Sequence, residues 1–147
     1  KKAIYNHNKY KIEEGLNKEE LLHSKIIRDA DKLDNFRVKK EENLINIFPN
    51  KYNPKTINYE EISPKVYNDF IEHKCIKSED RNTQIDFWIS FIAFIYDLNF
   101  DISFEYIKDN RYIDILIDRI EYKNEDTKEK MENIRKCAKE YLNDKVN

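Results

Sequence analysis

A single glycine, Gly15, occurs among the 147 residues of this chain, and this scarcity limits the folds open to it. Tight hairpins, phosphate-binding loops and dinucleotide-binding turns need glycine, because a Cβ disfavours the backbone conformations they require. All three prolines lie between residues 49 and 64, so no other segment contains a helix-breaking proline. The sequence therefore predicts long helices and excludes the folds that depend on glycine-rich loops.

The composition is that of one folded domain. Apolar side chains make up 39% of the sequence and aromatic ones 13%, which is enough for a core and argues against disorder. The 27 basic and 29 acidic residues leave a net charge of −2, so nothing indicates a nucleic-acid or membrane partner. No apolar run reaches the length of a membrane span and no signal peptide is visible. We therefore expect a cytoplasmic protein that binds neither nucleic acid nor membranes.

The two cysteines, Cys75 and Cys137, are far apart and belong to no Cys-x-x-Cys pair. That spacing makes a zinc cluster a poor interpretation. In a protein expected to be cytoplasmic, solitary thiols of this kind stay reduced. We expect both to be free and partly buried.

Apolar periodicity predicts an all-α protein, a compact irregular helical bundle without internal repeats. The segment 78–98 is apolar almost all round, which indicates the central buried helix, whereas 49–62 reads as a loop. A break is expected at Asn110. The helices are expected at 1–6, 17–40, 42–48, 63–74, 78–98, from 101 or 103 to 122, and from 126 or 127 to the C-terminal region.

The helix expected over residues 17–40 carries three aspartates in the stretch RDADKLD. At about 100° per residue, Asp29 and Asp34 fall inside the apolar arc and Asp31 lies at its margin. An ionised carboxylate in such a place needs a counter-charge, hydrogen-bond donors or a cation. Two explanations stay open, ion pairing with nearby basic residues and a metal or catalytic site. The arc expected to face the core comprises Leu22, Ile26, Ala30, Leu33 and Phe36, with Ile27 at one edge.

The stretch RDADKLD resembles the last motif of the HD superfamily of metal-dependent phosphohydrolases. In that family a helix carries a metal-binding aspartate after a small residue, as Ala30-Asp31 does here. The resemblance implies that residues 1–48 are the C-terminal part of an HD-like helical core and that 49–147 form a helical tail packed on it, in one continuous domain. Three further stretches resemble bacterial HD-domain proteins and the helical tail of one branch of them: NHNKYKI, DFWISFIAFIYDLNFDISFEYIKDNRYI and YKNEDTKEKMENI.

The resemblance assigns roles to the charged residues of this motif. It implies that Asp31 is a ligand of a divalent metal ion, which would activate water and neutralise phosphate charge in the complete protein. Arg28 and Lys32 would contact phosphate or pair with acids. Asp29 and Asp34, which the helical periodicity places inward, would orient neighbours or cap other helices.

The histidines are less clearly assigned. His7 follows the end of a predicted helix, and the resemblance implies a place near the substrate or a second metal, although an exposed loop histidine fits equally. His23 is expected to be partly buried on the RDADKLD helix, and His73 to lie near a helix end. None of the three is followed by aspartate, so the His-Asp pair that names the family is missing.

Two functions remain open. In the first, the chain is the C-terminal part of a metal-dependent phosphohydrolase that acts on a nucleotide or other small phosphate ester, inactive by itself, with the missing ligands upstream of Lys1. In the second, it is a non-catalytic helical interaction module that kept the HD-type core and lost the metal site. Either would leave an apolar surface exposed, so we expect self-association into a homo-oligomer.

Overall fold

The computed structural model describes all residues except 1, 8, 49–52, 54 and 147, and gives no side-chain placement for Tyr5. Its described part contains helices and no strand, so the predicted all-α class is confirmed. No helix in that part is both long and apolar enough to span a membrane. The α-helices are α1 (Lys2–Asn6), α2 (Lys18–Glu41), α3 (Leu44–Ile47), α4 (Pro64–Ile71), α5 (Gln84–Ile92), α6 (Asp101–Asp109), α7 (Tyr112–Asp118) and α8 (Glu125–Val146), and the 3₁₀ helices are η1 (Ile57–Tyr59), η2 (Ser78–Asp80) and η3 (Ala93–Asp97).

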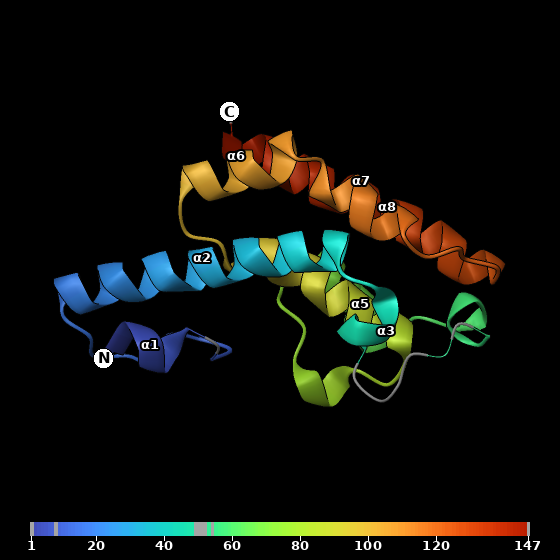
Figure 1. Ribbon diagram of the computed structural model, residues 1–147, viewed down its shortest axis with the longest axis horizontal. Coiled ribbons are helices and arrows are strands. Elements are labelled where there is room, and N and C mark those ends of the chain that lie inside the picture. Colours follow the sequence, from blue (N-terminus) through green and yellow to red (C-terminus); the bar gives the residue numbers. More distant parts are fainter. Residues whose placement is uncertain (1, 8, 49–52, 54, 147) are drawn as a thin grey trace.

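Helix α2 lies in the middle of the molecule and contacts α1, α5, α6 and α7. Helices α6, α7 and α8 form a layer along one side of it, and α5 lies on another side beneath its C-terminal half (Figure 1). The short helix α1 packs along the N-terminal half of α2. Helix α2 therefore lies against both the N-terminal helix and the segment 101–118.

Both ends of α2 are closed by side chains. Asn17 accepts a hydrogen bond from the backbone N–H of Glu20, and the Glu20 side chain accepts one from the backbone N–H of Asn17, which together form a capping box. At the other end, the Arg119 guanidinium donates to the carbonyl oxygens of Lys39 and Glu42. These contacts satisfy backbone groups that a helix cannot satisfy itself.

The predicted central helix lies in the core, but it is not continuous. Trp88 is completely buried on α5, and its Nε1 donates to the carbonyl oxygen of Leu116 over 2.8 Å. The expected helix 78–98 is divided into η2, α5 and η3, because Thr83 forms a capping box with Asp86 that starts α5 anew. The predicted break at Asn110 is confirmed, since α6 ends there and Arg111 adopts a left-handed conformation with φ of 56°.

The predicted orientation of α2 is wrong over its N-terminal half. Leu22 and Ile26 are each 48% exposed and Ala30 is also exposed, whereas Phe36 is buried as expected. The physical reason is that basic side chains are buried on this face instead, where their charged groups meet backbone carbonyls, a carboxylate or aromatic rings. The buried residues of α2 are Ser24, Arg28, Asp29, Lys32, Phe36 and Lys39.

Candidate functional site

A cavity of about 510 Å³ opens between α2, the segment after α1, the segment 75–81 and the α5–η3 region. We call it the Asp31 cleft. Its wall contains five basic side chains but only three acidic ones, so it carries a surplus of positive charge. The charged residues are Lys9, Arg28, Lys32, Lys77 and Arg81 against Asp31, Glu79 and Asp97, and the other lining residues include Tyr10, Asn35, Cys75, Ser90 and Phe94.

Asp31 lies on the α2 wall of this cleft. Arg28, Asp31, Lys32 and Asn35 are spaced three or four residues apart, which places them on one helix face. The Asp31 side chain is partly exposed, and its carboxylate makes no hydrogen bond or ion pair with any residue that the structure describes. It is thus a carboxylate that the surrounding protein leaves available to a ligand.

Arg28 fastens the N-terminal segment to α2. It is 1% exposed, and its guanidinium donates to the carbonyl oxygens of Asn6 (2.7 Å), Lys9 and Tyr10 (3.1 Å). The same group pairs with Asp97. Its Nε is buried without a hydrogen-bond partner in the described part of the chain. Arg28 therefore holds Asn6, Lys9 and Tyr10 beside α2 while contributing positive charge to the cleft.

Asp97 neutralises two cations at once. Besides Arg28, it pairs with the Lys32 ammonium over 3.0 Å, and Lys32 also lies 5.2 Å from the centre of the Phe94 ring. One carboxylate against two buried cations leaves positive charge uncompensated. Lys77 and Arg81 add to it, since neither forms an ion pair with the residues described here. The electrostatics of the cleft favour an anion.

Asp29 faces away from the cleft and has a structural role. It is 3% exposed, and its carboxylate accepts hydrogen bonds from the backbone N–H groups of Asn99 and Phe100, the Asn99 side-chain amide and the Ser103 hydroxyl. Phe100 is the N-cap of α6 and has no capping side chain of its own. The inward position predicted for Asp29 is confirmed, and it caps α6 from another helix.

The other predicted residues lie outside the cleft. Asp34 was expected to face inward, which is wrong: its side chain is 62% exposed and pairs with Arg37 over 2.8 Å, because the buried face of α2 is the polar one. His7 hydrogen-bonds through Nδ1 to the Ile4 carbonyl over 2.6 Å and does not line the cleft. His23 is exposed rather than partly buried, and His73 lies just after α4, as expected.

The described residues do not form a metal site by themselves. No group of three His, Cys, Asp or Glu side chains among them could hold a metal ion. Arg28 and Lys32, which lie beside Asp31 on the helix, are cations, and Asp97 is already engaged with both of them. The cysteines are free and partly buried, as predicted, and burial together with Asp97 raises the pKa of the Cys75 thiol to about 11. Cys75 is therefore a poor nucleophile.

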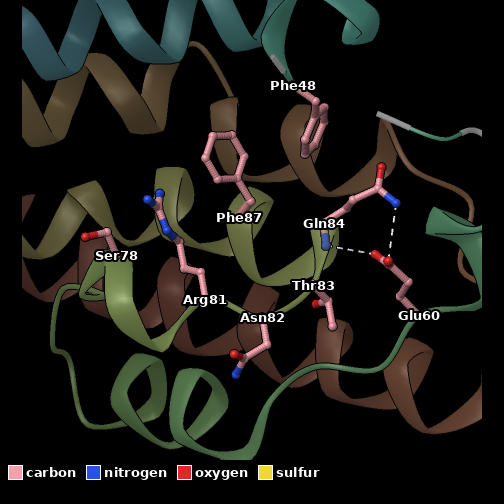
Figure 2. A pocket seen from close by; sticks show the side chains of 8 residues that line it. All are labelled: Phe48, Glu60, Ser78, Arg81, Asn82, Thr83, Gln84 and Phe87. Atoms are coloured by element: carbon pink, nitrogen blue, oxygen red, sulfur yellow. Dashed lines mark hydrogen bonds between the residues drawn. The ribbon is translucent and has the colours of Figure 1, made fainter. Parts of the chain in front are cut away.

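A second cavity of about 430 Å³ adjoins the first and shares Ser78 and Arg81 with it. We call it the Phe87 cavity. Figure 2 shows Arg81 and Glu60 on opposite sides of the cavity, with the rings of Phe87 and Phe48 next to each other between them. The remaining side chains are polar and come from the turn that starts α5: Asn82, Thr83 and Gln84.

Comparison with protein-family models, curated proteins and solved structures found no match for this chain. Function must therefore be argued from the cleft and the motif on its wall. Sequence reasoning missed Asp97, Lys77 and Arg81, which come from distant segments. No local pattern identifies them, because their proximity to Asp31 depends on how η2 and η3 pack against α2.

Proposed function

We propose that this chain binds a small phosphate ester in the Asp31 cleft, as the C-terminal part of an HD-type metal-dependent phosphohydrolase that is inactive by itself. One observation carries the proposal. The carboxylate of Asp31, the aspartate that the RDADKLD motif selects, has no hydrogen bond to the residues that the structure describes, and it lies on the wall of a cleft with surplus positive charge. Of the three aspartates in the motif, Asp29 and Asp34 are occupied by protein groups.

The positive charge suits a phosphate group. Guanidinium and ammonium groups bind phosphate through charge-assisted hydrogen bonds, and Arg81 and Lys77 have no carboxylate partner among the residues described. Asp31 would repel that phosphate unless a cation lay between them. A divalent metal ion would take this place, with Asp31 as one ligand and the remaining ligands from outside the described residues. We also propose the cytoplasm as the location, because both thiols are free.

Titration calorimetry with inorganic phosphate tests the proposal on the chain as it is. We expect millimolar binding, at least threefold weaker in Lys77→Gln and unchanged in Lys128→Gln, a control on α8 outside the cleft. Replacing Asp31 by Asn removes one negative charge that repels phosphate. We expect this to tighten phosphate binding in the absence of metal by about threefold to tenfold. Because the other ligands lie outside the described residues, Mn²⁺ should bind this chain weakly, and Asp31→Asn should weaken that binding further. Absence of phosphate binding would contradict the proposal.

The second candidate is a non-catalytic helical interaction module. The apolar side chains of Ile4, Leu22 and Ile26 favour it, because they are 68%, 48% and 48% exposed, respectively. Such residues on α1 and α2 could be covered by another copy of the chain. This function predicts a concentration-dependent dimer in analytical ultracentrifugation that Leu22→Ser and Ile26→Ser abolish together. It also predicts that Asp31→Asn changes neither phosphate nor metal binding.

A further inference from the structure

The Phe87 cavity has opposite charges at its two ends. The Arg81 guanidinium lies 4.7 Å from the centre of the Phe87 ring and donates to the Ser90 hydroxyl over 3.3 Å. Burial lowers the pKa of Arg81 from its usual value, yet an arginine stays charged. Half-buried and without a carboxylate partner in the described part of the chain, this cation favours an anionic ligand.

Glu60 at the other end of the cavity is held in place by hydrogen bonds, but its carboxylate can accept more of them. Its Oε1 accepts from the backbone N–H groups of Gln84 (2.9 Å) and Ile85 (3.3 Å), and its Oε2 accepts from the Gln84 side chain (3.2 Å). A carboxylate has about four acceptor positions, so Oε2 can still accept a hydrogen bond from a ligand. Figure 2 draws the hydrogen bonds between Glu60 and Gln84 as dashed lines. These contacts fix the carboxylate of Glu60, which is partly buried.

The wall between the two ends is aromatic. The Phe87 and Phe48 rings lie 5.5 Å apart at an angle of 45°, and Phe87 is partly exposed to the cavity. A flat heterocycle gains about 1–3 kcal/mol from stacking on such a ring. The cavity volume of about 430 Å³ lies within the range of small-molecule sites.

We infer that the Phe87 cavity is a base-binding subsite and that the phosphate ester is a nucleotide. The phosphate would lie in the Asp31 cleft beside Arg81, which borders both cavities. The base would stack against Phe87 and direct an N–H donor toward Glu60. This inference rests on the proposed function, because it extends the same ligand from one cavity into the next.

Comparing a nucleotide with its base-free part tests the inference. Titration of the chain with AMP and, separately, with ribose 5-phosphate should give AMP an affinity about fivefold to a hundredfold higher, as expected for one stacked base. In Phe87→Leu the ratio of the affinity for AMP to the affinity for ribose 5-phosphate should fall below threefold. Phe100→Leu replaces a partly buried ring outside both cavities and should change neither affinity.

A measurement on the wild type keeps the inference testable if Phe87→Leu fails to fold. Nuclear Overhauser effects between the adenine protons of AMP and the Phe87 ring protons are expected. Equal affinities for AMP and ribose 5-phosphate would overturn the base subsite and leave the phosphate-binding function standing. Binding of neither compound would overturn both. Tight AMP binding without contacts to Phe87 would also refute the subsite.

Discussion

Replacing Asp29 by alanine should destabilise the fold strongly, although this residue is only two positions from Asp31. The Asp29 carboxylate receives four donors that belong to residues 99–103, and it closes the N-terminus of α6. Alanine would leave those donors without an acceptor. The substitution therefore tests whether the buried acid of the motif serves structure or ligand binding.

The loss of unfolding free energy in Asp29→Ala depends on how accessible each unpaired donor is to water. The Ser103 hydroxyl is buried and the Phe100 N–H is partly buried, so each costs about 1 kcal/mol when unpaired, whereas Asn99 is exposed and can turn to solvent. Loss of a negative charge at a helix N-terminus adds about 0.5–1 kcal/mol. The total is about 3 kcal/mol, which corresponds to a fall in Tm of about 10 °C for a chain of this size.

Urea unfolding followed by circular dichroism measures this change. Asp29→Asn keeps one acceptor oxygen and should lose about half as much. Asp34→Ala breaks a pair whose side chains are 62% and 46% exposed, so it should stay within about 0.5 kcal/mol of the wild type. If Asp29→Ala lost less than 1 kcal/mol, the structural explanation of this residue would be refuted.

Three further predictions concern the neighbours of the cleft. Burial raises the pKa of Cys75 from 9.0 to about 11, so the stabilisation from its neutral thiol is present below pH 9 and is lost as the pH rises through 11. Urea unfolding should show a loss of about 2–3 kcal/mol over this pH range in the wild type but not in Cys75→Ala. In Cys137→Ala, iodoacetamide should modify Cys75 at pH 8 about a hundredfold more slowly than the denatured chain, because the thiolate fraction is that much lower. Arg28→Leu should speed hydrogen exchange of the amides in residues 2–10 at least tenfold, since a five-residue helix has no stability of its own.

The helices could be predicted from the sequence because their signals are local. The capping box at Asn17 and the near-absence of glycine required no knowledge of tertiary packing. The division of 78–98 is signalled locally by Thr83 and Asp86, but that signal was outweighed by the continuous apolar pattern around it. Secondary structure was thus predictable wherever apolar pattern and capping residues agreed.

The buried face of α2 could not be predicted in the same way. Helical periodicity assumes that apolar residues face inward, yet Leu22 and Ile26 are exposed while Arg28 and Lys32 are buried. Burial of a cation is favourable only when carbonyls, a carboxylate or aromatic faces are brought to it by other segments. Asp97 is 69 residues from Arg28 in sequence, and the carbonyl groups that hold Arg28 are 18 to 22 residues from it, so the pattern on α2 alone carried no sign of these partners.

Arg28, Asp29, Asp31 and Lys32, the four central charged residues of the motif, differ in their interaction partners. Arg28 is held by three carbonyls and a carboxylate, Asp29 by the donors at the start of α6, and Lys32 by Asp97 and a ring. Each of these is needed to pack α2 against a neighbour, so none is available to change partner. The Asp31 carboxylate makes no hydrogen bond or ion pair with the described residues, so it stays available to a ligand or ion on the wall of a cationic cleft. The packing of its neighbours is therefore the strongest physical reason for assigning a binding role to Asp31.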